Sequence, residues 1–229
     1  MQIGDFLWDG KRGRDVTSGD PVTLRKVERV LTPRLLAEIQ LLKRLSHPHI
    51  LRYRECVPTT THLYLVSDYC NGGSLDSFLE TVGSLSHVEL KFYMRQLRDA
   101  LRYLTDLKIT PPLVDGSTVL VLFNKPRTSL RYDYRDVVLK LVVDEVVGTR
   151  SDLCDIGVVL QKMIAKGVKT SYCFHLQDLL QRLSRTGSCS WESFFDHPYL
   201  VLDDVVAQEE SEVRLHHQVS LIEDYMYSL

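Results

Sequence analysis

The sequence predicts an α+β fold in which strands dominate the first third of the chain and helices dominate the rest. Early segments alternate between apolar and polar residues, which is the period of a half-buried strand. Later segments repeat apolar residues every three or four positions, which is the period of an amphipathic helix. Asn71-Gly72-Gly73 breaks the chain between these two parts. We therefore expect two lobes joined by a hinge.

The first part is expected to contain strands around one helix. Pro21 to Val30 alternates in the manner of a strand. Thr32 is a residue type that caps helices, and Pro33 suits a first helical turn, so a helix is expected from there to about Leu45. Two further strands are expected, from Ile50 to Cys56 and from His62 to Asp68.

The second part is expected to be mainly helical, with one pair of strands. The longest helical pattern carries Leu90, Leu97 and Leu104 on one side, and Pro111-Pro112 follows its end. The expected helices are Ser74–Glu80, Ser86–Leu107, Asp152–Ile164, His175–Leu183 and Trp191–Phe195, and the expected strand pair is Val119–Phe123 with Val137–Val143.

Composition is that of a globular protein, with 229 residues, 44% hydrophobic and 25% charged. The net charge of -2 gives no basic excess for nucleic acid or an anionic membrane. No apolar run is long enough to span a bilayer, and the first residues show no signal-peptide pattern. The five cysteines form no C-x-x-C pair, which favours reduced thiols. We therefore expect a cytoplasmic protein without nucleic-acid partners and without membrane insertion.

Four segments resemble, in the right order, parts of a Ser/Thr protein kinase. They are Ala37–Tyr53, His62–Leu79, Ser151–Ile164 and Trp191–Leu200. The Y-C-N-G-G-S-L segment and the F-F-x-H-P-Y-L ending are most similar to the ULK-type, autophagy-initiating kinases. The resemblance implies a bilobal protein kinase-like fold, with a β-rich N-lobe over residues 1–70 and a mainly helical C-lobe over residues 71–203. It also implies a shortened activation segment and a shortened stretch after Ile164, where kinases carry their αG region.

The motifs that kinases use for phosphate binding differ here from the family pattern. Gly4, Gly10 and Gly13 do not have the G-x-G-x-x-G spacing of a glycine-rich loop. Arg25 stands where kinases have the nucleotide lysine, and Glu38 matches its glutamate partner. The resemblance implies a nucleotide site in vestigial form, with six candidate residues: Arg25, Glu38, Ser67, Asp68, Tyr69 and Cys70.

The catalytic motifs also differ from the family pattern. An ungapped comparison places Leu113 at the catalytic aspartate, Thr118 at the metal-binding asparagine and Val143 at the aspartate of D-F-G. Phosphoryl transfer depends on such charged groups. The expectation from these motifs is a pseudokinase that is not an enzyme, with no catalytic residue, no metal site and no cofactor beyond weak ATP binding without magnesium.

The function expected from the resemblance is that of a protein-interaction or competitor module in kinase signalling, in autophagy or stress responses. Its partner would be an active kinase, or that kinase's regulator or substrate. Two alternatives stay open: a nucleotide-binding conformational switch without phosphoryl transfer, and an atypical active Ser/Thr kinase that uses Asp115 or Asp144.

Residues 204–229 are expected to form a C-terminal amphipathic helix. Apolar residues at spacings of four and three mark its apolar face. They are Leu215, Val219, Ile222 and Met226, followed by Leu229. This face either packs on its own domain or binds a partner protein.

Overall fold

The computed structural model describes residues 2–9, 12–27, 32–59, 62–83, 85–125, 133–143, 152–165, 174–184 and 189–202. The predicted tail helix, with its partner-binding candidates Leu215, Val219, Ile222 and Met226, lies outside these ranges. Asp144 also lies outside them.

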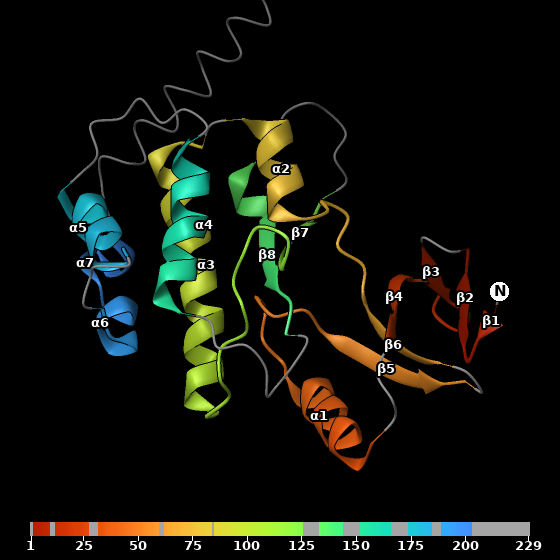
Figure 1. Ribbon diagram of the computed structural model, residues 1–229. Helices are drawn as coiled ribbons and strands as arrows, with labels where there is room; N and C mark the ends of the chain where they lie inside the picture. The colour runs from red at the N-terminus through yellow and green to blue at the C-terminus, as the bar shows by residue number, and fades with distance from the viewer. Residues whose placement is uncertain are drawn as a thin grey trace, which may run out of the picture.

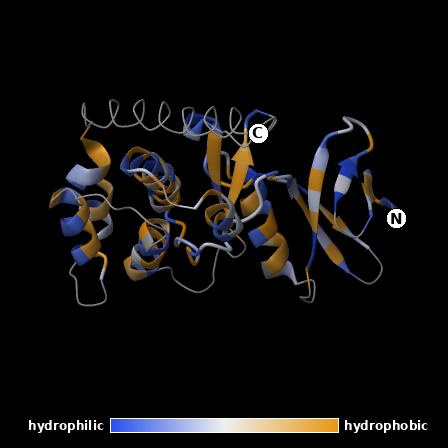
Figure 2. Cartoon of the chain, turned by 90° about the horizontal axis from the view of Figure 1, so that it is seen from above, coloured by the Kyte–Doolittle hydropathy of each residue, from blue (hydrophilic) through white to orange (hydrophobic). Residues whose placement is uncertain are grey.

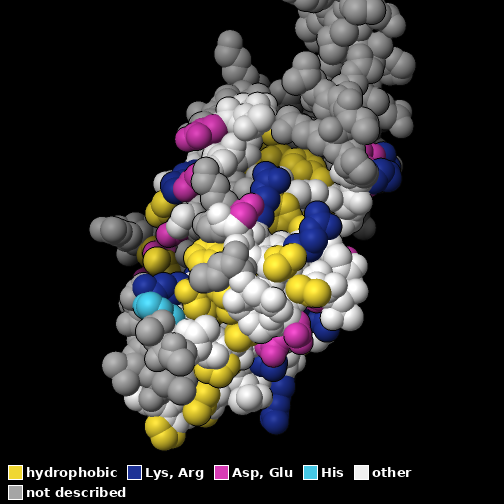
Figure 3. Space-filling model, turned by 90° about the vertical axis from the view of Figure 1, so that its right-hand side faces the viewer, with side chains coloured by type: hydrophobic (Ala, Val, Ile, Leu, Met, Phe, Trp, Pro, Cys, Tyr) yellow, Lys and Arg dark blue, Asp and Glu magenta, His cyan; other side chains and the backbone are white. Residues whose placement is uncertain are grey.

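The first part of the chain forms a six-stranded antiparallel sheet with the order β1-β2-β3-β4-β6-β5 (Figure 1). In this sheet β6 pairs with both β4 and β5, so β4 and β6, which are distant in sequence, lie side by side. The strands are β1 (Gln2–Ile3), β2 (Phe6–Trp8), β3 (Gly13–Asp15), β4 (Pro21–Val27), β5 (Tyr53–Pro58) and β6 (Leu63–Asp68). The end of the molecule formed by the first strands carries hydrophobic side chains among Lys and Arg side chains (Figure 3).

One face of this sheet has a small core of its own. Ile3, Phe6, Val22 and Val66 are buried there. Gly13 lies against this core, because a Cβ added to it would come within 2.1 Å of Leu24 Cδ1. The close approach of two strands therefore explains this glycine, which the sequence comparison had weighed as part of a phosphate-binding loop.

The other face of the sheet packs against α1 (Pro33–Arg44), which lies beside β5 in Figure 1. The Thr32 hydroxyl accepts a hydrogen bond from the Leu35 amide at 3.2 Å, and Pro33 occupies the first turn, as the sequence predicts. Ile39 and Leu42 are buried in the main core. The amphipathic stripe of this helix therefore positions it against the sheet.

The second part of the chain is mainly helical and surrounds α3 (His87–Asp106). Ser86 and Glu89 form a capping box at its start. The apolar stripe of α3 is fully buried. Figure 2 shows that the other helices and the strands are also hydrophobic along only part of their surface. The other elements are α2 (Leu75–Val82), β7 (Val119–Phe123), the 3-10 turn η1 (Tyr134–Asp136), β8 (Val137–Leu141), α4 (Leu153–Ala165), α5 (Phe174–Arg182), α6 (Trp191–Phe195) and α7 (Pro198–Val201).

The hairpin of β7 and β8 lies between the sheet and the helices. Gln96 of α3 closes one edge of it: its amide nitrogen donates to the Val137 carbonyl at 3.0 Å, and its amide oxygen accepts from the Leu139 amide at 2.7 Å. On the connection from the sheet, the Gly72 amide donates to the Val121 carbonyl at 2.8 Å. The hairpin is therefore bonded both to the helical part and to the chain that leaves the sheet.

The predicted α+β fold class, with a β-rich first part and a mainly helical second part, is confirmed, while several predicted bounds shift. The strand expected to begin at Ile50 begins at Tyr53, and the strand expected to end at Val143 ends at Leu141. Five elements were not among those predicted from the sequence, namely β1, β2, β3, η1 and α7. Among the described residues, no helix is both long enough and apolar enough to cross a membrane.

Replacing Gln96 with alanine should destabilise the fold by about 2 to 4 kcal/mol, because two buried backbone groups of β8 lose their partner. Chemical denaturation monitored by circular dichroism measures this change. Gln177→Ala, on an exposed position of α5, is the matched control and should change the free energy of unfolding by less than about 0.5 kcal/mol. Equal stability of the two variants would contradict the role assigned to Gln96.

Candidate functional site

The predicted nucleotide residues lie on the sheet face that α1 covers and on the connection that follows β6. Arg25 pairs in register with Leu65, and Thr23 pairs with Ser67, so their side chains share one face of the sheet. Glu38 of α1 is buried next to this face. The structure therefore brings Arg25, Ser67 and Glu38 to one side of the sheet, although they are distant in sequence. The side chain of Asp68, which pairs with Val22, alternates to the opposite face, and Tyr69 and Cys70 follow the end of β6.

At the end of β6 and in the connection, two side chains contact arginine residues. The Asp68 carboxylate forms an ion pair with Arg54 at 2.6 Å, and the Tyr69 ring lies 5.7 Å from the Arg12 guanidinium. Burial raises the pKa of the Cys70 thiol to about 11, so this thiol is neutral.

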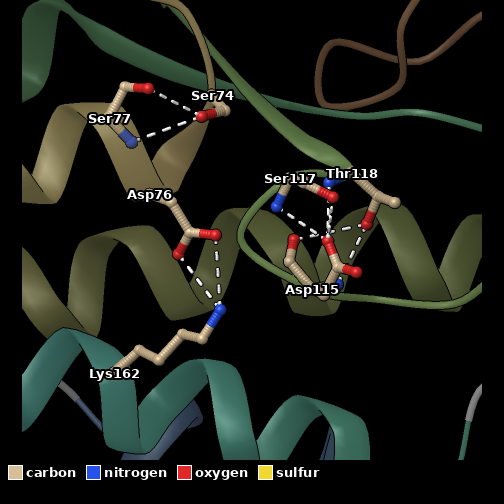
Figure 4. A network of polar contacts seen from close by, with 7 residues as sticks. All are labelled: Ser74, Asp76, Ser77, Asp115, Ser117, Thr118 and Lys162. Carbon is tan, nitrogen blue, oxygen red and sulfur yellow. Dashed lines mark hydrogen bonds and ion pairs between the residues drawn. The ribbon is translucent and has the colours of Figure 1, made fainter.

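The loop from Thr110 to Thr118, which we call the catalytic segment, is built around Asp115 (Figure 4). Its Oδ1 atom accepts hydrogen bonds from the Ser117 amide at 2.7 Å, the Thr118 amide at 2.8 Å and the Ser117 hydroxyl at 2.7 Å. The Thr118 hydroxyl donates to the Leu113 carbonyl at 2.9 Å. These bonds close the segment into a fixed turn.

The Asp115 carboxylate is ionised at neutral pH. Burial acts to raise its pKa, but hydrogen bonds from Ser117 and Thr118, together with the charge of Lys162, outweigh burial and lower the pKa. No hydrogen bond reaches its Oδ2 atom from the described residues. The catalytic segment therefore fixes Oδ1 of Asp115 by hydrogen bonds, while Oδ2 can accept a hydrogen bond from another molecule.

The catalytic segment is fastened to α2 and α4. The Asp76 amide donates to the Gly116 carbonyl at 3.1 Å, and Lys162 of α4 pairs with the Asp76 carboxylate at 3.1 Å (Figure 4). A Cβ added to Gly116 would lie 1.9 Å from Asp76 Oδ1, so a larger residue here would displace the Asp76 carboxylate from its present position. The sequence analysis missed this pair, because no local pattern links two residues on separate helices.

The positions compared with catalytic residues differ in exposure. Leu113 is 41% exposed, whereas Val143 is fully buried. Asp152, at the start of α4, lines a cavity of about 660 Å³ beside the catalytic segment, together with Thr110, Pro111 and Trp191. Within the described ranges, no group of three His, Cys, Asp or Glu side chains could hold a metal ion.

Comparison with known proteins identifies what this arrangement resembles. The protein kinase domain model matches residues 17–110. Rat serine/threonine-protein kinase ULK3 is 24% identical over 245 residues, covering 87% of this chain and 52% of the relative. Rice serine/threonine-protein kinase SAPK9 is 30% identical over 176 residues, covering 66% of this chain and 48% of the relative. The chain thus spans about half the length of these curated relatives.

A solved structure supports the fold independently of sequence identity. The structure of Rad53 residues 1–466 in complex with AMP-PNP superposes with a TM-score of 0.69 at 16% identity. The match covers 86% of this chain and 66% of that chain. The likeness therefore shows the fold.

These findings contradict the prediction that the chain is not an enzyme. The matching model is the protein kinase domain, and the relatives from rat, rice and zebrafish are named as kinases, which points to an enzyme. The prediction compared motifs position by position without gaps. Asp115 was considered only in the alternative of an atypical active kinase, and within the described residues one of its carboxylate oxygens receives no hydrogen bond.

Proposed function

Because the chain has a protein kinase-like fold and is similar in sequence to the ULK3 kinases, we propose that it acts in Ser/Thr kinase signalling by binding a protein partner. The partner is an active kinase, or that kinase's regulator or substrate. The proposed contact is the surface made by Asp76, Leu113, Asp115, Ser117 and Lys162, which we call the catalytic-segment surface. A role in autophagy or stress signalling rests on the ULK resemblance alone.

The observation that carries this proposal is the fixed turn around Asp115. A loop that is already ordered loses little conformational entropy when a partner binds, so more of the contact energy contributes to affinity. Three hydrogen bonds to Asp115 Oδ1 hold this loop, and the Asp76–Gly116 bond holds it against α2. The exposed Leu113 side chain projects from the same loop.

The charges on this surface favour a polar rim around an apolar contact. Lys162 and Asp76 are 44% and 41% exposed, so each can also reach a partner. Exposed ion pairs contribute little to folding stability. The charges of Asp76 and Lys162 can therefore contribute to the orientation in which a partner protein binds. An exposed apolar side chain, Leu113, together with exposed charges fits the mixture of apolar and polar contacts found in protein interfaces.

A second candidate function is phosphoryl transfer, which the kinase names of the relatives favour. Asp115 Oδ2 is the candidate acceptor for the proton of a substrate hydroxyl. The nucleotide would lie between Arg25 and the backbone of Ser67–Cys70, with the guanidinium in place of an ammonium group on phosphate.

Binding is tested by competition with an active kinase. Excess chain should slow phosphorylation of a protein substrate by purified ULK3, and Leu113→Asp should weaken this inhibition by about tenfold or more. Leu107→Asp, at an exposed position beyond α3, is the matched control and should inhibit like the unmodified chain. Absence of inhibition, or equal inhibition by both variants, would rule out the proposed surface.

Phosphoryl transfer is tested with ATP labelled on its γ-phosphate. Asp115→Asn keeps an oxygen acceptor for the loop amides but removes the carboxylate, so transfer should fall by about 10²-fold or more. Asp133→Asn is the control, because Asp133 also accepts from a backbone amide, in a different turn. Transfer that survives in Asp115→Asn would eliminate Asp115. ATP that raises the melting temperature without any transfer would support the nucleotide-binding switch instead.

A further inference from the structure

The loop between α1 and β5 is fastened directly to the C-lobe. Ile50 forms a parallel bridge with Leu141 of β8. The Leu51 amide donates to the Leu141 carbonyl at 2.9 Å, and the Leu141 amide donates to the His49 carbonyl at 2.9 Å. Residues 46–51, which we call the lobe latch, therefore join the N-lobe to the β7–β8 hairpin a second time, apart from the Ser67–Asn71 connection.

His47 shapes this latch through one ring nitrogen. Its Nδ1 atom accepts a hydrogen bond from the His49 amide at 3.1 Å, which requires Nδ1 to carry no proton. Its ring stacks on Tyr103 of α3 with centroids 5.0 Å apart and planes inclined by 27°. The Tyr103 hydroxyl accepts from the Ser46 amide at 3.2 Å. The neutral imidazole thus holds the loop in its turn and against α3.

His49 contributes a contact across the lobes. Its Nδ1 atom lies 3.3 Å from the Leu139 carbonyl, so Nδ1 is the protonated nitrogen of this ring. The His49 ring centroid is 5.6 Å from that of His47. Two imidazolium charges at this separation would repel each other.

The surrounding charges do not offset the positive charge that protonation would place on His47 and His49. Asp99 of α3 is the nearby acid, and its Oδ1 already accepts two hydrogen bonds from Arg98, at 2.8 and 2.9 Å. Lys140 of β8 adds a positive charge that disfavours protonation of both rings. The last turn of α1, which precedes the latch, carries the basic residues Lys43 and Arg44.

We infer that the lobe latch is a pH-sensitive junction that opens when His47 and His49 become protonated. A proton on His47 Nδ1 removes the acceptor of the His49 amide and places a charge against Tyr103. Opening would release residues 46–51 from β8 while the Ser67–Asn71 connection stays intact. The N-lobe would then be free to change its angle to the C-lobe.

The electrostatic surroundings set the direction of the pH dependence. Burial lowers the pKa of both histidines from the ordinary value of 6.5, and Lys140 acts in the same direction. The Leu139 carbonyl raises the pKa of His49 and Asp99 raises that of both rings, but the lowering effects are larger. The open latch therefore takes up protons more readily than the closed latch. Its closed form is fully favoured above about pH 6.5 and loses stability as the pH falls below that value.

Hydrogen exchange of the full chain, followed by NMR and corrected for intrinsic rates, tests the latch. Between about pH 7.5 and about pH 5.5, protection of the Leu51 and Leu141 amides should fall by about tenfold or more. Protection of the α3 amides of Leu97 and Leu101 should stay constant. An equal loss at all four amides would mean global unfolding and would overturn the inference, as would unchanged protection of Leu51.

A matched variant separates histidine titration from other acid effects. In the double variant His47→Asn and His49→Asn, amide oxygen and nitrogen replace the two Nδ1 atoms but do not titrate, so the pH dependence at Leu51 should vanish. His62→Gln, on the same lobe near Tyr64, should retain it. If the double variant keeps the pH dependence, the latch is not the responsible element.

Discussion

The β7–β8 hairpin is the element on which the rest of the structure depends. A two-stranded hairpin is only marginally stable alone, and its edges expose unpaired backbone groups. Here Gln96 satisfies two of those groups from α3, and Gly72 and Leu51 satisfy others from the N-lobe side. Backbone hydrogen bonding of one small hairpin thus determines how the two lobes meet.

Hydrogen bonds to the β7–β8 hairpin also position the candidate site. The Asn71 amide group bonds to both the nitrogen and the carbonyl of Phe123, and the Val121 amide donates to the Gly73 carbonyl. A Cβ added to Gly72 would come within 2.6 Å of Val121 Cγ1, so the connection runs close to β7. Because α2 begins directly after this contact, Asp76 is brought against the catalytic segment.

The elements that could be predicted from the sequence are those whose signals are local. The cap at Thr32 lies within one helical turn, and the stripe of α3 repeats every three or four residues; both are present as predicted. Strands of two or three residues, such as β1 and β2, are too short to show alternation. Gly13 could be noticed but not interpreted, since its close neighbours are Val22 and Leu24 of the paired strand β4, and this pairing is not visible in the sequence.

The candidate site was harder to predict because its contacts are not local. The sequence shows that Asp115 is an acidic residue near the expected catalytic position. Only the folded loop shows that its Oδ1 atom accepts hydrogen bonds from Ser117 and Thr118 while its Oδ2 atom accepts none from the described residues. The pairing of Asp76 with Lys162 spans 86 positions, and residue spacing carries no information about it. The prediction that the chain is not an enzyme rested on single motif positions, whereas the relatives that match over longer stretches are named as kinases.

The most direct test of the proposed protein-binding surface is a hydrogen–deuterium exchange footprint of the full chain with and without purified ULK3. The account predicts slower exchange in residues 110–119 and at the start of α2, because partner contact would cover the turn around Asp115. Protection confined to α5, α6 and α7, or to the strands β1 to β3, would contradict it. That result would move the site of partner binding to another surface of the molecule.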